Sequence, residues 1–353
     1  MKKLLSIGLG VMLFMSSIGI SSANESINIS RVSGYDRYET AVNANKKFMD
    51  HANGNLAVIS SGSDFKTALY ASHMASALKV PYFVNPKHGV RTDILNEMQR
   101  LNVSRVYVVG DYKVLDRSVD NTLKSKGMKL QRFYERYEAL ENGAYYKSTL
   151  SEQVDMAIIN TFFPDDLIRG VFSNAIAIND NKFPDLLSSI PLTSELASKY
   201  FKYIVNPEEL YVGMNIDEGA NHYMNIGGHN SVSAKYNIAE YINDDFIKTD
   251  KNRIYGQNRY ETAVEVAKGY KTYLNKDIKT IVLVNGEDYP DALSSSLVAT
   301  QNDGAVLLTQ SNKLNKDTAK YIKDSGIKNI IIVGGEKSVS KSVENELRNL
   351  YLK

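Results

Sequence analysis

Two arginines with identical neighbours are the first residues of this chain that could do chemistry. Residues 37–41 read Arg-Tyr-Glu-Thr-Ala, and residues 259–263 repeat the same five. Each block falls at the predicted start of a helix, where the helix dipole disfavours a cation. A guanidinium that recurs there needs a partner, either a group of the protein itself or a bound anion. Both roles stay open from the residues alone. We expect the structural one, in which Arg37 and Arg259 bond a carboxylate or a backbone carbonyl.

A second candidate is the junction between a strand and a helix at residues 285–291. Asn285 and Gly286 end a short apolar run, and a helix is predicted to begin near Pro290. Ligands of open α/β sheets bind at such carboxyl ends of strands. Asp291 would repel a phosphate there, and the chain has neither G-x-G-x-x-G nor a P-loop lysine pattern. The junction is therefore weak evidence for a nucleotide site, and we expect Asp291 to cap the helix or to pair with an arginine.

Residues for catalysis are sparse in the sequence. The chain has no cysteine and no G-x-S-x-G pattern, so neither a thiol nor a serine-elbow nucleophile is indicated. Its histidines lack metal-ligand spacing; they are His51, His73, His88, His222 and His229. The sequence predicts no catalytic residue, no metal and no cofactor.

The arginine blocks belong to a longer internal repeat. Arg31 and Gly34 precede the first block as Arg253 and Gly256 precede the second, and a worn copy runs from Arg132 through Arg-Tyr-Glu-Ala at residues 136–139. Two further landmarks recur in the same order in all three copies. They are Phe-Lys-Thr-Ala-Leu at 65–69, Phe-Pro-Asp-Leu-Leu at 183–187 and Tyr-Pro-Asp-Ala-Leu at 289–293, followed by the glycine-containing segments at 106–110, 226–233 and 330–340. A period of about 100 residues is that of a domain. We predict three repeats, at residues 24–130, 131–250 and 251–353.

The third copy shows which elements position these residues. Apolar spacing and the capping-box pair Asn258/Glu261 predict a helix over 258–274, and Asp36/Glu39 repeat that pair in the first copy. Short apolar runs predict strands at 280–284, 305–308 and 329–333, and helices are predicted at 316–325 and 338–350. Strands that alternate with helices indicate parallel sheets with helices on both faces. The fold class is α/β, with three open parallel-sheet modules and not one barrel.

The N-terminus and the charge restrict the partners. Lys2 and Lys3, an apolar stretch over 4–20 and Ser-Ser-Ala at 21–23 form the pattern of a signal peptide, which is favoured over a membrane anchor. Without residues 1–23 the formal charge is near zero, 42 − 2 cations against 40 anions. A chain with so little net charge has no long-range field to attract nucleic acid. We expect a secreted protein that binds neither nucleic acid nor, after cleavage, a membrane.

These motifs resemble the type 2 cell-wall-binding repeat of clostridial cell wall and surface-layer proteins. The resemblance rests on Arg-x-x-Gly-x-x-Arg-Tyr-Glu-Thr-Ala, on Phe/Tyr-Pro-Asp-Ala-Leu-Ser and on Val-Gly-Gly-x-x-Ser-Val-Ser. In the first copy Lys66-Thr67 replaces Pro-Asp and Gly110-Asp111 replaces Gly-Gly, and the second copy carries extra residues between Tyr145 and Gly170.

The resemblance implies three α/β repeats packed in a compact pseudo-threefold unit that anchors the protein non-covalently to an anionic wall polysaccharide. The family's Ile-Leu-Leu strand, which is tied to polymer binding, corresponds to residues 306–308, and its counterparts are residues 82–84 and 203–205. The candidate polymer-binding residues are Arg37, Tyr38, Arg136, Tyr137, Arg259, Tyr260, Val306, Leu307 and Leu308.

We therefore expect a wall-anchoring protein without a further domain, a minor component of the surface layer that could also contact other surface-layer proteins. The alternatives are a cell-wall hydrolase of the amidase type, or a modifier of one, and a surface adhesin.

Overall fold

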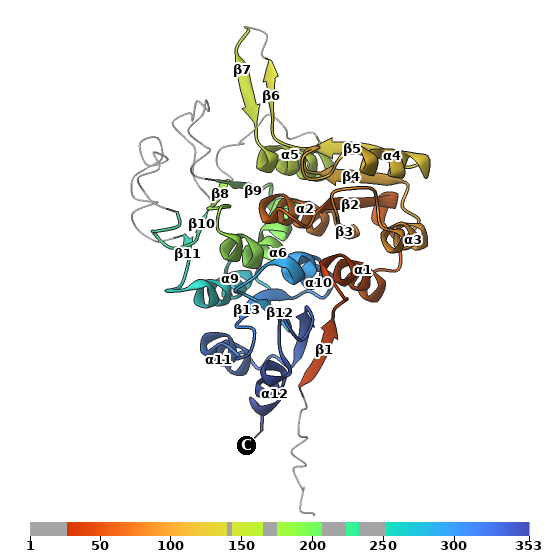
Figure 1. Cartoon of the computed structure of the whole chain (residues 1–353). Helices are drawn as coiled ribbons and strands as arrows, with labels where there is room; N and C mark the ends of the chain where they lie inside the picture. Colours follow the sequence, from red (N-terminus) through yellow and green to blue (C-terminus); the bar gives the residue numbers. More distant parts are fainter. Residues whose placement is uncertain (1–26, 140–142, 165–174, 207–223, 233–251, 353) are drawn as a thin grey trace, which may run out of the picture.

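The computed structural model describes residues 27–139, 143–164, 175–206, 224–232 and 252–352 (Figure 1). It confirms the α/β class: these residues form three four-stranded parallel sheets and one antiparallel hairpin. The predicted signal peptide at 1–23 lies outside the described residues. Within the described ranges, no helix is both long and apolar enough to cross a membrane.

Sheet 1 has the strand order β3-β2-β4-β5 and is parallel throughout. Its strands are β2 (Leu56–Ser61), β3 (Tyr82–Asn85), β4 (Arg105–Val109) and β5 (Lys129–Phe133). The helices of this part of the chain are α1 (Arg37–Phe48), the short η1 (Asn53–Asn55), α2 (Phe65–Leu78), α3 (Thr92–Arg100) and α4 (Arg117–Ser125). Strands β2 and β3 are buried along their whole length, as expected for a sheet covered on both faces.

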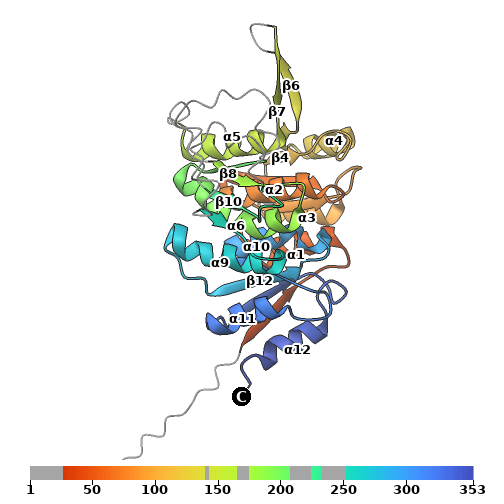
Figure 2. The ribbon, with the colours of Figure 1, turned by 90° about the vertical axis from the view of Figure 1, so that its left-hand side faces the viewer.

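Sheet 2 has the order β11-β10-β8-β9. Its strands are β8 (Ala175–Ile178), β9 (Tyr203–Val205), β10 (Met224–Ile226) and β11 (Arg253–Ile254), and helices α5 (Leu150–Phe162) and α6 (Phe183–Tyr200) accompany them. Before α5 the chain forms a hairpin of β6 (Arg136–Ala139) and β7 (Tyr145–Ser148). Figure 2 shows this hairpin projecting from the body at the end opposite to α11 and α12.

Sheet 3 has the order β1-β14-β12-β13. Its strands are β1 (Asn28–Val32), β12 (Thr280–Asn285), β13 (Ala305–Thr309) and β14 (Asn329–Val333). The helices are α9 (Arg259–Leu274), η3 (Pro290–Ser294), α10 (Ser295–Gln301), α11 (Lys316–Asp324) and α12 (Lys341–Asn349). The helix predicted near Pro290 therefore begins as a 3-10 turn.

One edge strand of every sheet comes from another repeat: the following repeat for sheets 1 and 2, and the first repeat for sheet 3. Strands β5 and β11, which carry the first arginine of repeats 2 and 3, complete sheets 1 and 2. Strand β1 of repeat 1 completes sheet 3, with Asn28 opposite Asn329 and Val32 opposite Val333 (Figure 1). The boundaries predicted at 130/131 and 250/251 therefore do not separate the sheets. Each sequence repeat begins with a strand that belongs to the sheet of another repeat. The boundary of the sequence repeat therefore differs from the boundary of the sheet.

The helices that begin at or just after the second repeated motif, at residues 65–69, 183–187 and 289–293, meet in the interior. Helices α2, α6 and α10 contact one another in every pairing. Phe65 and Phe183 begin α2 and α6, and Tyr289 directly precedes η3, which leads into α10. The ring centroids lie 6.2 Å apart for Phe65 and Phe183, 5.6 Å for Phe65 and Tyr289, and 5.9 Å for Phe183 and Tyr289. Aromatic pairs at such distances stabilise a contact beyond the area that they bury. This shared cluster joins the three repeats into one core, and the expected pseudo-threefold symmetry itself stays a prediction.

Candidate binding site at the junctions between repeats

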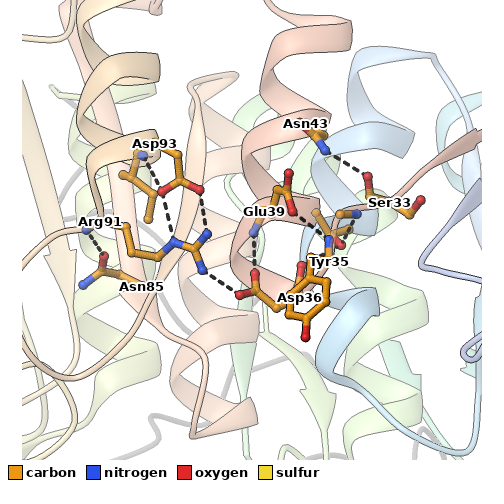
Figure 3. Close-up of polar contacts among 11 residues, drawn as sticks. Ser33, Tyr35, Asp36, Glu39, Asn43, Asn85, Arg91 and Asp93 are labelled. Atoms are coloured by element: carbon orange, nitrogen blue, oxygen red, sulfur yellow. Dashed lines mark hydrogen bonds and ion pairs between the residues drawn. The ribbon is translucent and has the colours of Figure 1, made fainter.

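The recurring Arg-Tyr-Glu blocks begin helices α1 and α9, as the sequence predicts. Asp36 caps α1: its Oδ1 accepts the backbone N–H of Glu39 at 2.8 Å, and Glu39 Oε2 accepts the N–H of Tyr35 at 2.7 Å (Figure 3). Asn258 and Glu261 make the same two bonds in α9, at 3.0 and 2.8 Å. The glutamate of the motif is thus a capping residue that satisfies free N–H groups at the helix start.

The glycine and the threonine of the motif have structural roles as well. The N–H of Gly34 donates to Thr40 Oγ1 at 2.9 Å, and the N–H of Gly256 donates to Thr262 Oγ1 at 3.1 Å. A Cβ on Gly34 would lie 2.5 Å from the Cβ of Glu39, and one on Gly256 would lie 2.2 Å from the matching glutamate Cβ. Only glycine fits this close approach, so much of the motif is fixed by the fold.

The arginines of the blocks bond backbone carbonyls. Nη1 of Arg37 donates to the carbonyl oxygen of Gly62, and Nη1 of Arg259 donates to that of Gly286 at 2.5 Å. Both glycines directly follow a strand, β2 or β12. The structure therefore gives each guanidinium a partner of the protein itself, as we expected.

The tyrosines that follow these arginines pack on the same glycines. A Cβ on Gly62 or on Gly286 would lie 3.0 Å from Cε1 of Tyr38 or of Tyr260, respectively. The guanidinium of Arg91 lies over the ring of Tyr38, with Cζ 5.4 Å from the centroid. Burial raises the pKa of the Tyr260 hydroxyl, and the charge of Glu287 adds to the effect. Both tyrosines hold the first turn of their helix against the end of a strand.

Arg91 also forms an internal ion-pair network at the start of α1. Its Nη1 bonds Asp36 at 2.6 Å and its Nη2 bonds Asp93 at 2.7 Å, while its backbone N–H reaches Asn85 Oδ1 at 3.4 Å (Figure 3). Partial burial alone would raise the pKa of Asp93, but the hydrogen bond and charge of Arg91 lower it overall. The two carboxylates therefore share one arginine, whose single positive charge offsets one of their two negative charges.

A second set of arginines ties each repeat to a neighbouring one, and the first of them ties repeat 1 to repeat 3. Arg31, Arg132 and Arg253 stand in the exchanged strands β1, β5 and β11, and each donates Nη1 to the carbonyl of a glycine with φ near +120°. The acceptors are Gly334, Gly110 and Gly227, at 2.8, 2.7 and 2.9 Å. We call these contacts junction 3–1 (Arg31 with Gly334), junction 1–2 (Arg132 with Gly110) and junction 2–3 (Arg253 with Gly227).

The degenerate copy of the block, at residues 136–139 of repeat 2, does not lie at the start of a helix. Arg136 and Tyr137 lie in β6 of the hairpin and not at a helix start. Helix α5 begins later, at Leu150, after the capping box of Thr149 and Glu152. The reason is that capping geometry starts this helix, and the block at 136–139 has no Ser, Thr, Asp or Asn directly before it. Arg136 is thus not the structural equivalent of Arg37, and the alignment of the two residues is wrong.

The apolar triplet Val306, Leu307 and Leu308 forms the centre of β13 and is fully buried. Strands β13, β3 and β9 each lie at one edge of their sheet, so the predicted correspondence with residues 82–84 and 203–205 is confirmed by the topology. Buried side chains contribute to the core and do not present a surface to a polymer.

An open cavity lies at junction 2–3. Two adjoining pockets of about 350 and 400 Å³ share Lys182, Asp185 and Arg259. The first is also lined by Phe65 and Phe183, and the second by residues of the segments 228–231 and 255–258. They lie where β8, β10 and β11 end, the edge at which open parallel sheets bind ligands. The described ranges contain no group of His, Cys, Asp and Glu that could hold a metal ion.

The charges of this cavity are arranged around one carboxyl. Burial raises the pKa of Asp185, although the bond from Ser231 Oγ at 3.0 Å and the charges of Lys182 and Arg259 oppose that rise. Arg259 lies over the ring of Phe183, with Cζ 5.7 Å from the centroid. Lys182 is exposed, and its Nζ donates to the carbonyl of Asn230 at 3.0 Å. The cavity thus combines the exposed Lys182 with aromatic faces, an arrangement that suits an anionic sugar chain, while Arg259 is held by the carbonyl of Gly286. Lys182 was not among the residues predicted from the sequence. The only sequence signal for it is its position directly before the motif at residues 183–187.

Comparisons with known proteins match two of the three predicted repeats, the first and the third. A family model described as cell wall binding domain 2 (CWB2) matches residues 31–120 and 253–344, just over half of the chain. Among curated proteins, the chain is 24% identical over 344 residues to N-acetylmuramoyl-L-alanine amidase LytC and 21% identical over 323 residues to the amidase enhancer, both of Bacillus subtilis. It spans 61% and 40% of their lengths, so its match covers only part of each.

Two solved structures share the fold. Cwp6 from Clostridium difficile superposes with a TM-score of 0.68 at 19% identity, and Cwp8 from the same organism with 0.66 at 18%. These matches cover 93% and 91% of this chain and 48% and 52% of the two solved chains. At such identities the likeness concerns the fold.

Proposed function

The chain belongs to the cell wall binding domain 2 family, and we propose that it attaches non-covalently to a Gram-positive cell wall by binding an anionic wall polysaccharide. The observation that carries the proposal is the family match at residues 31–120 and 253–344. We further propose that residues 1–23 direct secretion, and that the protein resides in the cell wall or surface layer, where it contacts other surface-layer proteins.

We propose junction 2–3 as a place where the polymer binds. Lys182 supplies an exposed cation there, and residues of the segment 255–258 line the same pocket. We assign Arg259 to the scaffold of this pocket because its Nη1 already bonds the carbonyl of Gly286. Arg37, Tyr38 and Tyr260 have the same supporting role, and the buried triplet at 306–308 shapes the sheet without touching the polymer.

Binding of the purified chain, starting at Asn24, to deproteinised walls tests the proposal. Walls should retain the protein, and walls stripped of their anionic polymer should not. Equal retention by stripped walls would show that the polymer is not the ligand. High salt should weaken binding only in part, because the chain has almost no net charge to supply a screened long-range attraction.

A pair of lysine variants tests the site. Lys182→Ala should weaken retention on intact walls, whereas Lys320→Ala, an exposed lysine of α11 outside the pocket, should not. Equal behaviour of the two variants would count against junction 2–3 and leave wall binding itself intact.

The names of two relatives suggest a second candidate, a hydrolase or a modifier of one. LytC is an N-acetylmuramoyl-L-alanine amidase by name, but the chain spans only 61% of it. We propose that the present chain does not hydrolyse peptidoglycan itself. Incubation with purified peptidoglycan should release no new amino or reducing ends, and their release, abolished by one point mutation, would establish the hydrolase instead.

A further inference from the structure

Two of the three junctions carry a pair of aromatic rings at matched positions. At junction 1–2 the rings of Tyr112 and Tyr134 lie 6.4 Å apart, centroid to centroid. At junction 2–3 His229 and Tyr255 lie 5.8 Å apart. In both, the first ring comes two residues after the junction glycine and the second two residues after the junction arginine. The pairing is therefore a feature of these junctions and not of one loop.

Junction 3–1 lacks this pair. Its matching positions hold Glu336 and Ser33. The nearby cation is neutralised as well, since Nζ of Lys341 lies 3.5 Å from Glu336. A carboxylate therefore stands where the other two junctions present a ring.

Cations surround the aromatic pair of junction 1–2. The guanidinium carbons of Arg117 and Arg132 lie 4.6 and 4.2 Å from the ring centroid of Tyr112, and that of Arg136 lies 5.9 Å from the ring of Tyr134. Arg132 and Arg136 each have a carboxylate partner.

Arg117 differs from these two arginines. It is exposed, and within the described part of the chain no ion pair involves it. It is also the first residue of α4, where the helix dipole disfavours a cation. Its guanidinium thus lies over a ring, is exposed and makes no ion pair within the described residues, which is the state of a group prepared for an external anion.

We propose that Tyr112, Tyr134 and Arg117 form a polymer-binding subsite at junction 1–2, which takes a sugar ring with an adjacent anion. The ring faces pack on the apolar face of the sugar, and the guanidinium bonds a phosphate or carboxylate oxygen in its two-pronged geometry. Junction 2–3 is the second such subsite. Junction 3–1 is not one, because it offers no ring pair and its cation, Lys341, is already paired with Glu336.

This inference rests on the proposed function and states which junctions carry it. Two subsites on one rigid body bind a long polymer together, so losing either subsite lowers the avidity for walls more than the affinity for one sugar unit. Avidity gains from a second site commonly reach roughly 100-fold or more. A variant that destroys junction 1–2 should therefore lower the apparent affinity for intact walls by at least about tenfold.

Three single variants of the secreted chain test the subsite, with intact walls as the probe. Arg117→Glu should lower the affinity by at least that factor, and Tyr112→Glu, which copies junction 3–1, should do the same. Lys341→Glu makes the matched charge reversal at junction 3–1 and should leave affinity unchanged. Melting curves accompany each measurement, and Arg117→Ala serves if a glutamate variant unfolds, because this exposed side chain forms no ion pair within the described residues.

The outcomes separate the two proposals. Wild-type affinity in both junction 1–2 variants, or an equal loss in Lys341→Glu, overturns the subsite and leaves wall binding standing. Failure of the wild type to bind walls overturns both. Walls treated with hydrofluoric acid, which removes phosphodiester-linked polymers, and walls whose carboxyl groups have been reduced distinguish the phosphate from the carboxylate: the difference between wild type and Arg117→Glu should vanish on the walls that have lost the anion bound by Arg117.

Discussion

Replacing Arg31 with alanine tests the exchange of edge strands between repeats. The side chain belongs to β1 of repeat 1, yet its Nη1 bonds the carbonyl of Gly334 at 2.8 Å and its Nη2 lies 3.4 Å from Glu344. A hydrogen bond from a charged donor contributes about 1.5–3 kcal/mol, and a partly exposed ion pair adds at most about 1 kcal/mol. We expect a loss of about 2–4 kcal/mol in the stability of sheet 3, not of sheet 1.

Hydrogen exchange followed by mass spectrometry measures where this loss falls. A loss of 2–4 kcal/mol corresponds to roughly 30- to 700-fold faster exchange for amides that exchange through local opening. The increase should appear in β12 and β14, about 250 to 300 residues from the mutation in sequence. Arg132→Ala is the matched control, because its guanidinium bonds Gly110 at 2.7 Å and its loss should accelerate exchange in β2 and β4 instead. Faster exchange in β2 and β4 of Arg31→Ala, with β12 and β14 unchanged, would refute the exchanged-strand explanation.

Three further predictions concern the motif and a buried carboxyl. Gly256→Ala should lower the melting temperature by several degrees, because its Cβ would lie 2.2 Å from another Cβ, whereas Gly335→Ala, with no atom within 4 Å of its Cβ, should not. Arg259→Ala should lower stability by about 1.5–3 kcal/mol through the lost carbonyl bond and leave wall affinity per folded molecule unchanged; a wild-type melting curve with lost wall binding would show that the arginine binds the polymer. Burial raises the pKa of Asp155, against the opposing bond from His73. The folded chain then holds this proton more tightly than the unfolded chain, so stability falls as the pH rises from the unfolded value of about 4 through the folded pKa. The difference in melting temperature between wild type and Asp155→Asn, measured from pH 4 to 8, should show this fall, and a pH-independent difference would contradict it.

Part of the candidate site could be predicted from the sequence because its signals are local. A cap and its glutamate are three residues apart, so Asn258 and Glu261 indicate a helix start without reference to the rest of the chain. The apolar run at 280–284 is likewise part of β12, which spans Thr280–Asn285. The same local rule shows why the block at 136–139 misled: it copies the letters of the motif, but Glu135 in front of it is not a capping residue, and Thr149 provides the cap for α5.

Some residues that differ between matching positions of the repeats can be explained only from the fold. In repeat 2 Asp185, in the first turn of α6, accepts a bond from Ser231, and the matching positions of repeat 1 hold Thr67 and Val114. Val114 cannot donate a hydrogen bond, and the hydroxyl of Thr67 bonds Asp64 instead, so neither position leaves a buried polar group without a partner, which would cost about 1–3 kcal/mol. The two positions are far apart in the sequence, but in the structure of repeat 2 their side chains contact each other.

The sequence by itself determined the α/β class and the caps and predicted three repeats, because each depends on residues that are near neighbours or that recur at one period. Only the tertiary structure decided which strands pair, which side chains are exposed and which rings meet. From its sequence, strand β1 could be the edge strand of any of the three similar sheets. It pairs with β14, in which Asn329, the residue opposite Asn28, is 301 residues away in the chain. Parallel pairing has no local turn to fix it, since the hydrogen bonds that hold it form only after distant segments have come together. For the same reason the aromatic pair Tyr112 and Tyr134 has no signature in the chain: each ring belongs to a different repeat, and the exchange of edge strands brings them side by side.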